Sequence, residues 1–162
     1  VPVFCCERRV TSFGCEFRCV KFRTMTHRPA VPGDQITRGN DPRVTKVGAV
    51  LRLYRLDEIS QLIDILRGTM SFVGTRPEVP EYVQQYTPQM RATLLLPAGV
   101  TSTASIEFKD EAEILAAAPP GQDAHLTPVL PAKIRPNLRH GPNFSTGRDL
   151  SIALRTVLAV AR

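Results

Sequence analysis

The first part of the chain alternates between apolar and polar positions, a pattern that predicts a β-hairpin. Its two arms, residues 2–9 and 16–25, are rich in Val, Phe and Cys, and residues 12–14 supply a turn between them. Because neighbouring strand residues point to opposite faces, Lys21 and Arg23 share one face of the second arm. That face is either an ordinary half-exposed strand surface or a basic surface with a chemical use, and the other face can join the core.

Two apolar stripes at helical spacing follow a loop rich in Pro, Gly and Asp at residues 27–40. Thr45 is the expected N-cap of the first helix, and Gly68 stands where the second is expected to end. The stripes consist of Val47, Val50, Leu51 and Tyr54, and of Ile59, Leu62, Ile63 and Leu66. Asp57 and Glu58 then fall in the first turn of the second helix. The helix dipole favours acidic residues there, so this pair has a structural explanation as well as a chemical one.

The next part of the chain predicts shorter elements. Residues 69–73 are expected to form a short buried strand, and residues 74–77 a turn that presents Arg76 beside a glycine and a proline. Further expected elements are helices at 81–86 and 88–96 and an extended segment at 100–108.

The end of the chain predicts a linker and a last helix. Residues 116–125 have linker-like composition but are too few to mark a second domain. One face of the last helix carries Leu150, Leu154, Val157, Leu158 and Ala161, with arginines elsewhere. Such a helix could lie on a membrane surface or pack on the core, and its mostly small apolar side chains favour the core.

Length and composition limit the class of protein. With 162 residues and 43% hydrophobic content, the chain can bury one core, so we expect a single domain over residues 1–162. The formal charge of +6 favours nucleic acid, anionic lipid or phosphorylated small molecules as partners. Nucleic acid rests on charge alone, since no reading motif with interleaved aromatic residues accompanies it. No stretch approaches the ~18 consecutive apolar residues of a membrane-spanning helix.

The four cysteines, all within the first nineteen residues, lack the paired spacing of a zinc site. Free thiols in a reducing cytoplasm are the expected state. Signatures of several enzyme classes are also missing from the sequence: a P-loop, a dinucleotide-binding glycine motif, a zinc-protease helix and a nucleophile elbow. What remains is carboxylate and guanidinium chemistry.

That chemistry suits transfer of a phosphoryl-type group, which needs a nucleophile and cations to neutralise the phosphate oxygens. A carboxylate can be the nucleophile, and a neighbouring carboxylate can hold Mg²⁺ together with phosphate oxygens and water. Bidentate phosphate contacts could come from Arg23, Arg43, Arg52 and Arg76. Composition permits this reaction without requiring it.

Four motifs in order point to one family. They are KFRTM at 21–25, NDPRVTKVG at 40–48, LRLYRLDEISQL at 51–62 and GTMSFVGTRPEVPEY at 68–82. With them, the chain resembles the bacterial sugar transferase family, the monotopic polyprenyl-phosphate phosphoglycosyl transferases. The likeness continues through residues 87–88, 99–102, 108–111 and 130–162. Each motif alone is weak evidence, whereas their order and spacing are very specific.

The resemblance implies a two-step reaction on the cytoplasmic face of the bacterial inner membrane, the first membrane step of exopolysaccharide or glycoconjugate synthesis. The residue matching Asp57 attacks the phosphate next to the sugar of a UDP-sugar, and UMP leaves. A polyprenyl phosphate, such as undecaprenyl phosphate, then takes the phosphosugar from the enzyme. Glu58 matches the acid that binds Mg²⁺. The basic positions that match residues grouped around the phosphates are Lys21, Arg23, Arg52 and Arg76.

The chain departs from the family pattern at several turns. Family members usually have proline where Ser60 and Thr75 stand, a basic residue and proline at residues 97–98, and RQERVG at residues 6–11. Losing a proline loosens a turn by about 1 kcal/mol through unfolded-state entropy, so we expect weakened activity. The alternative is an inactive relative that serves as a membrane-surface or partner-binding module.

The family also carries an N-terminal hydrophobic helix that enters one leaflet, just before the position of Val1. No such helix is among these 162 residues, so we expect the chain to be the catalytic globule of such an enzyme. Its basic surface and last helix would be the remaining membrane contacts. The expected architecture is a compact, helix-rich α/β globule with a small N-terminal β-hairpin or sheet and no doubly wound parallel sheet.

Overall fold

The N-terminal hairpin forms where the alternating pattern predicts it. A computed structural model of the chain describes residues 2–26, 41–108, 129–140 and 145–160. Strand β1 (Phe4–Val10) pairs antiparallel with β2 (Glu16–Phe22), and the short 3-10 helix η1 (Ser12–Gly14) joins them. The rings of Phe4 and Phe22 stack across the strand ends, with centroids 5.1 Å apart.

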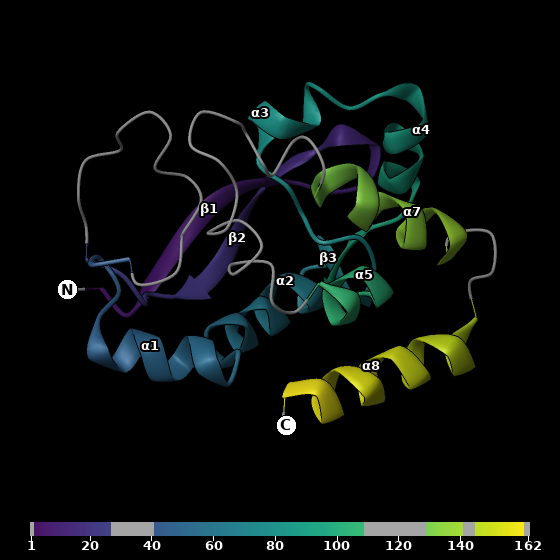
Figure 1. Cartoon of the computed structure of the whole chain (residues 1–162). Coiled ribbons are helices and arrows are strands. Elements are labelled where there is room, and N and C mark those ends of the chain that lie inside the picture. Colours follow the sequence, from purple (N-terminus) through teal and green to yellow (C-terminus); the bar gives the residue numbers. More distant parts are fainter. Residues whose placement is uncertain (1, 27–40, 109–128, 141–144, 161–162) are drawn as a thin grey trace.

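Most of the remaining elements are short helices (Figure 1). The helices are α1 (Lys46–Leu53), η2 (Leu56–Gln61), α2 (Leu62–Leu66), α3 (Pro80–Val83), α4 (Pro88–Arg91), η3 (Ala92–Leu95), α5 (Thr103–Glu107), α7 (Leu130–His140) and α8 (Thr146–Val160). Two further strands are β3 (Met70–Val73) and β4 (Ala98–Thr101). The fold is therefore the helix-rich α/β type with a small antiparallel hairpin that the sequence predicts. The expected loop at 27–40 and linker at 116–125 lie outside the described residues.

A second small sheet carries the turn that presents Arg76. Strands β3 and β4 pair in parallel, and the chain leaves β3 through Gly74. A Cβ atom on Gly99 would lie 2.1 Å from the nitrogen of Gly74, so only glycine allows the two backbones to approach this closely. Pairing of β3 with β4 thus fixes the start of the segment that leads to Arg76.

The prediction of extended structure at 100–108 is correct for the first residues and wrong for the rest. Strand β4 ends at Thr101, and helix α5 begins two residues later. The cause is a local cap, because the hydroxyl of Ser102 accepts a hydrogen bond from the backbone N–H of Ser105 at 3.0 Å. The mixed composition after the cap concealed a single helical turn.

The core lies between the hairpin, α3 and α7. Its buried members are Val10, Val83, Tyr86, Leu130 and Ile134. Strand β1, α3 with the segment just after it, and α7 therefore enclose this core, although they are distant in sequence.

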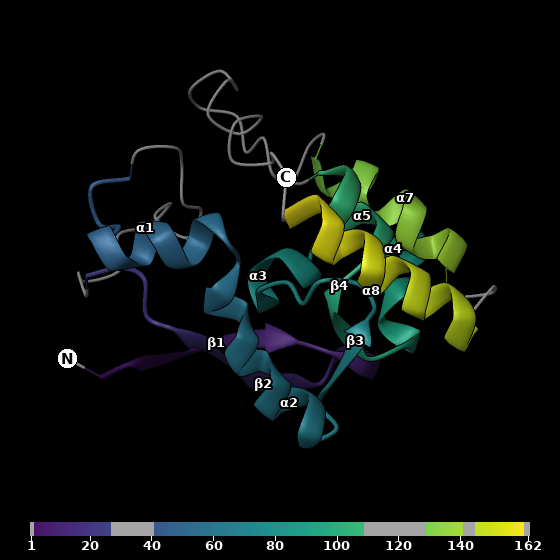
Figure 2. The same cartoon turned by 90° about the horizontal axis from the view of Figure 1, so that it is seen from below.

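Both apolar helical stripes that the sequence predicts lie on the surface, along with the apolar face of α8. We call this surface the apolar face. Its exposed members are Val47, Val50, Leu53, Tyr54, Leu56, Ile59, Leu62, Ile63, Leu66, Phe72, Leu150, Leu154, Val157 and Leu158. Helices α2 and α8 both pack against β3. Figure 1 draws α1 and α8 along the lower side, and Figure 2, seen from that side, has α1, α2 and α8 in view.

The sequence favoured packing of the apolar stripe of α8 on the core, because its side chains are mostly small. This prediction is wrong, since the stripe is exposed. The opposite side of α8 packs inward instead, through buried Ile152 and through Thr156, whose hydroxyl lies 2.6 Å from that of Thr101. Exposure reaches 72% at Leu150. Within the described ranges, no helix combines the length and apolar character needed to cross a bilayer.

Candidate active site

The acidic pair lies at a sharp change of chain direction between α1 and α2. Helix α1 ends at Leu53, and Arg55 is the N-cap of the 3-10 helix η2. Arg55 has a positive φ of 51°, a conformation that few non-glycine residues adopt. Asp57 and Glu58 occupy the first turn of η2, as predicted. The turn directs this pair toward the hairpin and the Arg76 segment rather than along the axis of α1.

Glu58 forms the strongest ion pair of this site. Both nitrogens at the end of the Arg76 guanidinium donate to it, Nη1 to Oε2 at 3.1 Å and Nη2 to Oε1. Burial opposes ionisation of Glu58, but the charge and hydrogen bonds of Arg76 lower its pKa to about 2, with smaller help from Lys21 and Arg55. Glu58 is therefore a charged acceptor well above pH 2, and Arg76 fixes its orientation.

Asp57 is tuned in the opposite direction. Burial and the neighbouring charge of Glu58 raise the pKa of Asp57 above its ordinary value, against the charges of Lys21 and Arg52. We expected the helix dipole to favour the ionised form. The helix is only six residues of 3-10 type, and its dipole is too weak to outweigh burial and repulsion. A carboxylate with a raised pKa is more basic, and so more nucleophilic when ionised, than an unperturbed one.

Lys21 reaches the site from β2, and two residues that sequence reasoning missed hold it there. Its Nζ lies 3.2 Å from Oε2 of Glu7 on β1, and the same oxygen accepts from Nη2 of Arg9 at 2.6 Å. Despite burial, Lys21 and Arg9 together lower the pKa of Glu7 to about 2. Arg9 also donates to the carbonyl of Pro77 at 3.3 Å, next to Arg76. An alternation of charge on β1 is the signal that could have indicated this link.

Two further predicted arginines lie on the same side of the molecule. The Nε of Arg52 donates to the hydroxyl of Thr24 at 2.8 Å, and the charge of Arg52 opposes part of the rise in the pKa of Asp57. Arg23 follows directly after β2, and its buried Nε has no hydrogen-bond partner in the described part of the chain. Buried donors are nearly always paired, so this nitrogen is a candidate ligand for an anion.

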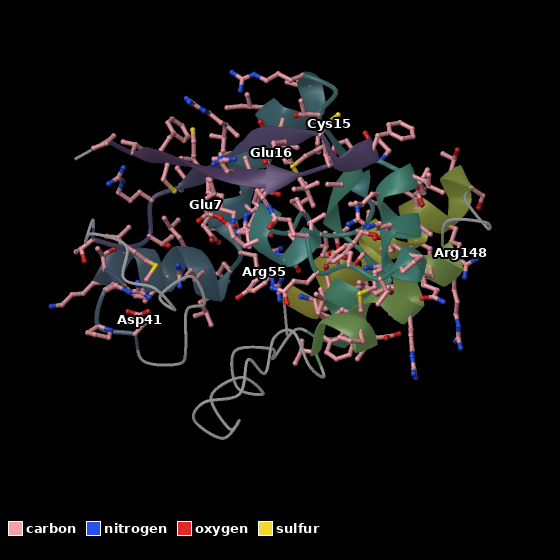
Figure 3. The ribbon with its side chains drawn as sticks, turned by 90° about the horizontal axis from the view of Figure 1, so that it is seen from above. Glu7, Cys15, Glu16, Asp41, Arg55 and Arg148 are labelled. Atoms are coloured by element: carbon pink, nitrogen blue, oxygen red, sulfur yellow. The ribbon has the colours of Figure 1, made fainter. Side chains whose placement is uncertain are left out.

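Arg43 is held differently from the other predicted arginines. Its Nη2 lies 2.6 Å from Oδ2 of Asp41, and its Nε lies 3.0 Å from Oδ1. These hydrogen bonds lower the pKa of Asp41 to about 2. Figure 3 shows Asp41 beside α1, to one side of Glu7 and Arg55, with Arg148 toward the opposite end of the molecule. Asp41 thus holds the guanidinium of Arg43 through Nε and Nη2.

Hydrogen bonds hold one of the turns expected to be loose. The hydroxyl of Thr11 donates to the carbonyl of Thr69 at 2.8 Å and accepts from the backbone N–H of Ala98 at 3.1 Å. A proline at position 98 has no N–H and could not make the second bond. Thr11 and Ala98 thus join the hairpin to both strands of the parallel sheet.

The donor set of the acidic pair fits Mg²⁺. No group of three or more His, Cys, Asp or Glu side chains able to hold a metal occurs in the described ranges. The resemblance assigns the metal to Glu58, which has Asp57 as its neighbour. Mg²⁺ commonly takes one or two carboxylates and completes its shell with phosphate oxygens and water. Each oxygen of Glu58 keeps a lone pair beyond the one that Arg76 occupies. The repulsion that raises the pKa of Asp57 is what a cation would relieve.

Comparison with known proteins assigns the family. The model of the family described as bacterial sugar transferase matches residues 1–162, so the chain belongs to the bacterial sugar transferase family.

Three relatives illustrate the range of similar proteins. The exopolysaccharide production protein ExoY of Rhizobium meliloti is 32% identical, over 98% of this chain and 70% of its own length. The UDP-glucose:undecaprenyl-phosphate glucose-1-phosphate transferase of Caulobacter vibrioides is 31% identical, over 89% of this chain and 51% of its own. The UDP-N-acetylgalactosamine-undecaprenyl-phosphate N-acetylgalactosaminephosphotransferase of Aeromonas hydrophila is 40% identical, over 52% of this chain and 20% of its own. The chain thus spans between a fifth and about two thirds of these proteins.

Proposed function

We propose that this chain is the catalytic domain of a polyprenyl-phosphate phosphoglycosyl transferase. It moves a sugar-1-phosphate from a UDP-sugar to undecaprenyl phosphate, at the first membrane step of exopolysaccharide or glycoconjugate synthesis. The names of the relatives support the donor and acceptor, and the family supports the class of reaction.

The different states of the two neighbouring carboxylates carry the proposal. Arg76 holds Glu58 by two hydrogen bonds, whereas Asp57 makes no ion pair with any described residue and has a raised pKa. One carboxylate is thus fixed as a charged ligand, and its neighbour keeps an oxygen with the basicity of a nucleophile. Two carboxylates that only complemented a helix dipole would not differ in this way.

The reaction balances as two displacements at one phosphorus atom. An oxygen of Asp57 bonds to the phosphorus that carries the sugar, and the bond from that phosphorus to the bridging oxygen breaks, so UMP leaves with the electron pair. An oxygen of undecaprenyl phosphate then attacks the same phosphorus. The bond to Asp57 breaks, which regenerates the carboxylate and releases a polyprenyl diphosphosugar.

Each basic residue near the acidic pair has a separate role toward the negatively charged UDP-sugar. Lys21 and Arg52 act on Asp57 through their charges, and Arg23 offers its buried Nε to a phosphate oxygen. Arg76 orients Glu58 and lies where a second phosphate oxygen can share its guanidinium. Glu58 would hold Mg²⁺, which when bound would supply neutralisation of the negative charge on the phosphate oxygens.

The apolar face brings the site to the lipid-linked acceptor. In η2, the exposed side chains of Leu56 and Ile59 flank Asp57 and Glu58, so the acidic pair lies at the edge of an apolar surface. A polyprenyl phosphate keeps its chain in the bilayer and its phosphate at the headgroups, which matches that edge. Exposed leucines on three helices would be unfavourable in water, and insertion into a leaflet removes the penalty.

The four cysteines favour the cytoplasmic leaflet of the inner membrane. All four are free thiols, including two neighbours, Cys5 and Cys6, on β1. Exposed thiols persist in a reducing compartment and are oxidised outside it.

A trapping experiment tests the nucleophile directly. The chain is incubated with Mg²⁺ and UDP-glucose or UDP-N-acetylgalactosamine, without acceptor, and its intact mass is measured under denaturing conditions. We expect the mass of one phosphosugar to be added in wild type and in Glu81→Gln, an exposed acid on α3, but not in Asp57→Asn. On addition of detergent-solubilised undecaprenyl phosphate, UMP release by Asp57→Asn should be about 1,000-fold slower. Equal release by wild type and Asp57→Asn would overturn the assignment.

The alternative function, a non-catalytic membrane-surface module, predicts a different outcome. Such a chain would bind anionic vesicles through the apolar face, yet form no adduct and release no UMP with either donor. Vesicle binding with catalysis supports the transferase, and vesicle binding alone supports the module.

A further inference from the structure

Strand β2 has an edge that β1 does not cover, and side chains from η2 and α2 occupy it. In an antiparallel pair, the N–H and C=O groups of one residue both point to the partner strand or both point away. The two groups of Val20 point away from β1. Its N–H donates to Oδ2 of Asp64 at 2.8 Å, and its C=O accepts from the hydroxyl of Ser60 at 3.0 Å. Two side chains thus take the place of a neighbouring strand.

These hydrogen bonds lie in the interior. Asp64 is 1% exposed, and Ser60 and Val20 are buried as well. Loss of either bond would leave a backbone group buried without a partner, which is strongly unfavourable. The other contact of the Asp64 carboxylate is weak, 3.8 Å from Nη1 of exposed Arg67. The bond to Val20 is therefore the main interaction of the Asp64 side chain, and it requires an acceptor oxygen at this position.

The same bonds set the distance between the acidic pair and Lys21. Ser60 is three residues after Asp57, and its hydroxyl also lies 3.4 Å from the carbonyl oxygen of Asp57. Lys21 directly follows Val20 on β2. Holding Val20 against Ser60 and Asp64 therefore holds the lysine against the turn that carries Asp57.

We propose that Ser60 and Asp64 are positioning residues, which clamp the catalytic turn to the open edge of β2 at Val20 and so place Asp57 against Lys21. Neither residue touches the substrate. The kinetic part of this inference rests on the proposed function. The structural part, the occupation of the two Val20 groups, does not.

The test compares variants that differ in hydrogen-bonding ability rather than in size. Asp64→Asn keeps an oxygen that can accept from Val20, whereas Asp64→Leu has similar shape and no acceptor. Ser60→Ala removes only the hydroxyl. Thr156→Val is the control, because it removes a hydroxyl from α8, away from the acidic pair. For each variant, kcat and KM for UMP release are measured with Mg²⁺ and detergent-solubilised undecaprenyl phosphate, and the exchange of the Val20 amide is followed by ¹⁵N NMR.

For a clamp, we expect kcat to fall about 100-fold in Asp64→Leu and about tenfold in Ser60→Ala, with KM changed by less than about threefold, since misplacement of a reacting group affects the transition state most. Asp64→Asn should stay within about threefold of wild type, and the control should match it. Exchange of the Val20 amide should accelerate in Asp64→Leu alone. A folded Asp64→Leu with wild-type kcat, or an Asp64→Asn as slow as Asp64→Leu, overturns the proposal.

Two further outcomes remain informative. If Asp64→Leu does not fold, Ser60→Ala and Asp64→Asn still decide, because a tenfold loss in the first and near-normal kcat in the second are expected only for a clamp. If wild type itself releases no UMP, the proposed function fails. The clamp is then judged from exchange of the Val20 amide, which should accelerate in Asp64→Leu and stay as in wild type in Asp64→Asn. Equal exchange in wild type and Asp64→Leu contradicts the clamp.

Discussion

The inner and outer sides of residues 56–66 differ in a way that is opposite to an ordinary surface helix. On the inner side, Ser60, Gln61 and Asp64 are polar and buried. The outer side is apolar and exposed, with Leu56, Ile59, Leu62, Ile63 and Leu66. A helix on the surface of a globule in water normally buries its apolar stripe. This segment instead packs its polar side against the protein and leaves its apolar side exposed.

The difference teaches that each side is stable for a separate reason. Polar groups are tolerated inside because they have partners, as Asp64 and Ser60 have at Val20 and Glu58 has at Arg76. For the apolar groups outside, the proposed membrane contact supplies the reason, because a lipid surface would cover them. Changes on the inner side should therefore affect folding and chemistry, and changes on the outer side should affect membrane binding alone.

Removal of Arg76 should have the largest effect on the inner side. Arg76→Ala leaves the carboxylate of Glu58, whose side chain is 11% exposed, without its bidentate partner. We expect the free energy of unfolding at pH 7 to fall by about 3 kcal/mol and UMP release to fall at least ~100-fold. Urea unfolding and initial rates measure the two effects. Adding Glu58→Gln to Arg76→Ala should restore most of the stability and none of the activity. An Arg76→Ala chain as stable as wild type would contradict this pair.

Lowering the pH should reduce the free energy of unfolding, because Glu58 on the inner side becomes protonated. Its pKa is about 2 in the folded chain against an ordinary 4.5, so the ion pair stabilises the fold above pH 4.5, and this stability is lost as pH falls toward 2. The expected loss is about 3 kcal/mol. Urea unfolding at several pH values in this window measures it. Glu58→Gln should lose less stability than wild type over the same window, and parallel losses in both would disprove the contribution of Glu58.

Charge on the outer side should reduce membrane binding without affecting the fold. Leu66 is 88% exposed, so Leu66→Glu should change the free energy of unfolding by less than about 0.5 kcal/mol. Flotation with anionic vesicles should show roughly tenfold weaker binding, because one inserted leucine is lost and a charge is added. Leu66→Met keeps an apolar side chain and should bind like wild type. Equal flotation of all three chains would place the membrane contact elsewhere.

Neutralising Glu7 should have the smallest effect, since its side chain is 43% exposed. Glu7→Gln keeps a hydrogen-bond acceptor but no longer balances the charge of Lys21. We expect stability to change by less than about 1 kcal/mol, and KM for the UDP-sugar to fall two- to threefold by rough estimate, as Lys21 attracts phosphate more strongly. Glu16→Gln, which alters the exposed pair with Arg8, is the control and should leave KM unchanged. A higher KM in Glu7→Gln would reverse the role assigned to this residue.

Several elements could be predicted from the sequence because residues a few positions apart decide them. The hydroxyl of Thr45 accepts from the backbone N–H of Gly48 at 2.9 Å and caps α1 as expected. Gly68 has a φ of 75° where the second helix was expected to end. The hairpin turn at 12–14 follows from local residue preferences in the same way. The ion pair between Asp41 and Arg43 is equally local.

The candidate site was predictable as a set of residues but not as an arrangement. The order of motifs pointed to Asp57, Glu58 and Arg76, yet no local rule pairs Glu58 with an arginine 18 positions away. The role of Glu7 could not be predicted, because its partner Lys21 becomes adjacent only when the two strands pair. The sign of the pKa shift of Asp57 also depends on burial, which the chain acquires only on folding.

The sequence by itself determined the family, the hairpin, the caps and the acidic pair, since these depend on residue identity and on short-range geometry. Only the tertiary structure decided which way the apolar stripes face and what holds the catalytic turn. Periodicity tells that leucines share a side of a helix, and it carries no information on what packs against that side. The partners of Ser60 and Asp64 are the main-chain groups of Val20, about 40 residues earlier in the chain. Every non-proline residue carries the same main-chain groups, so the sequence does not indicate which residue provides them.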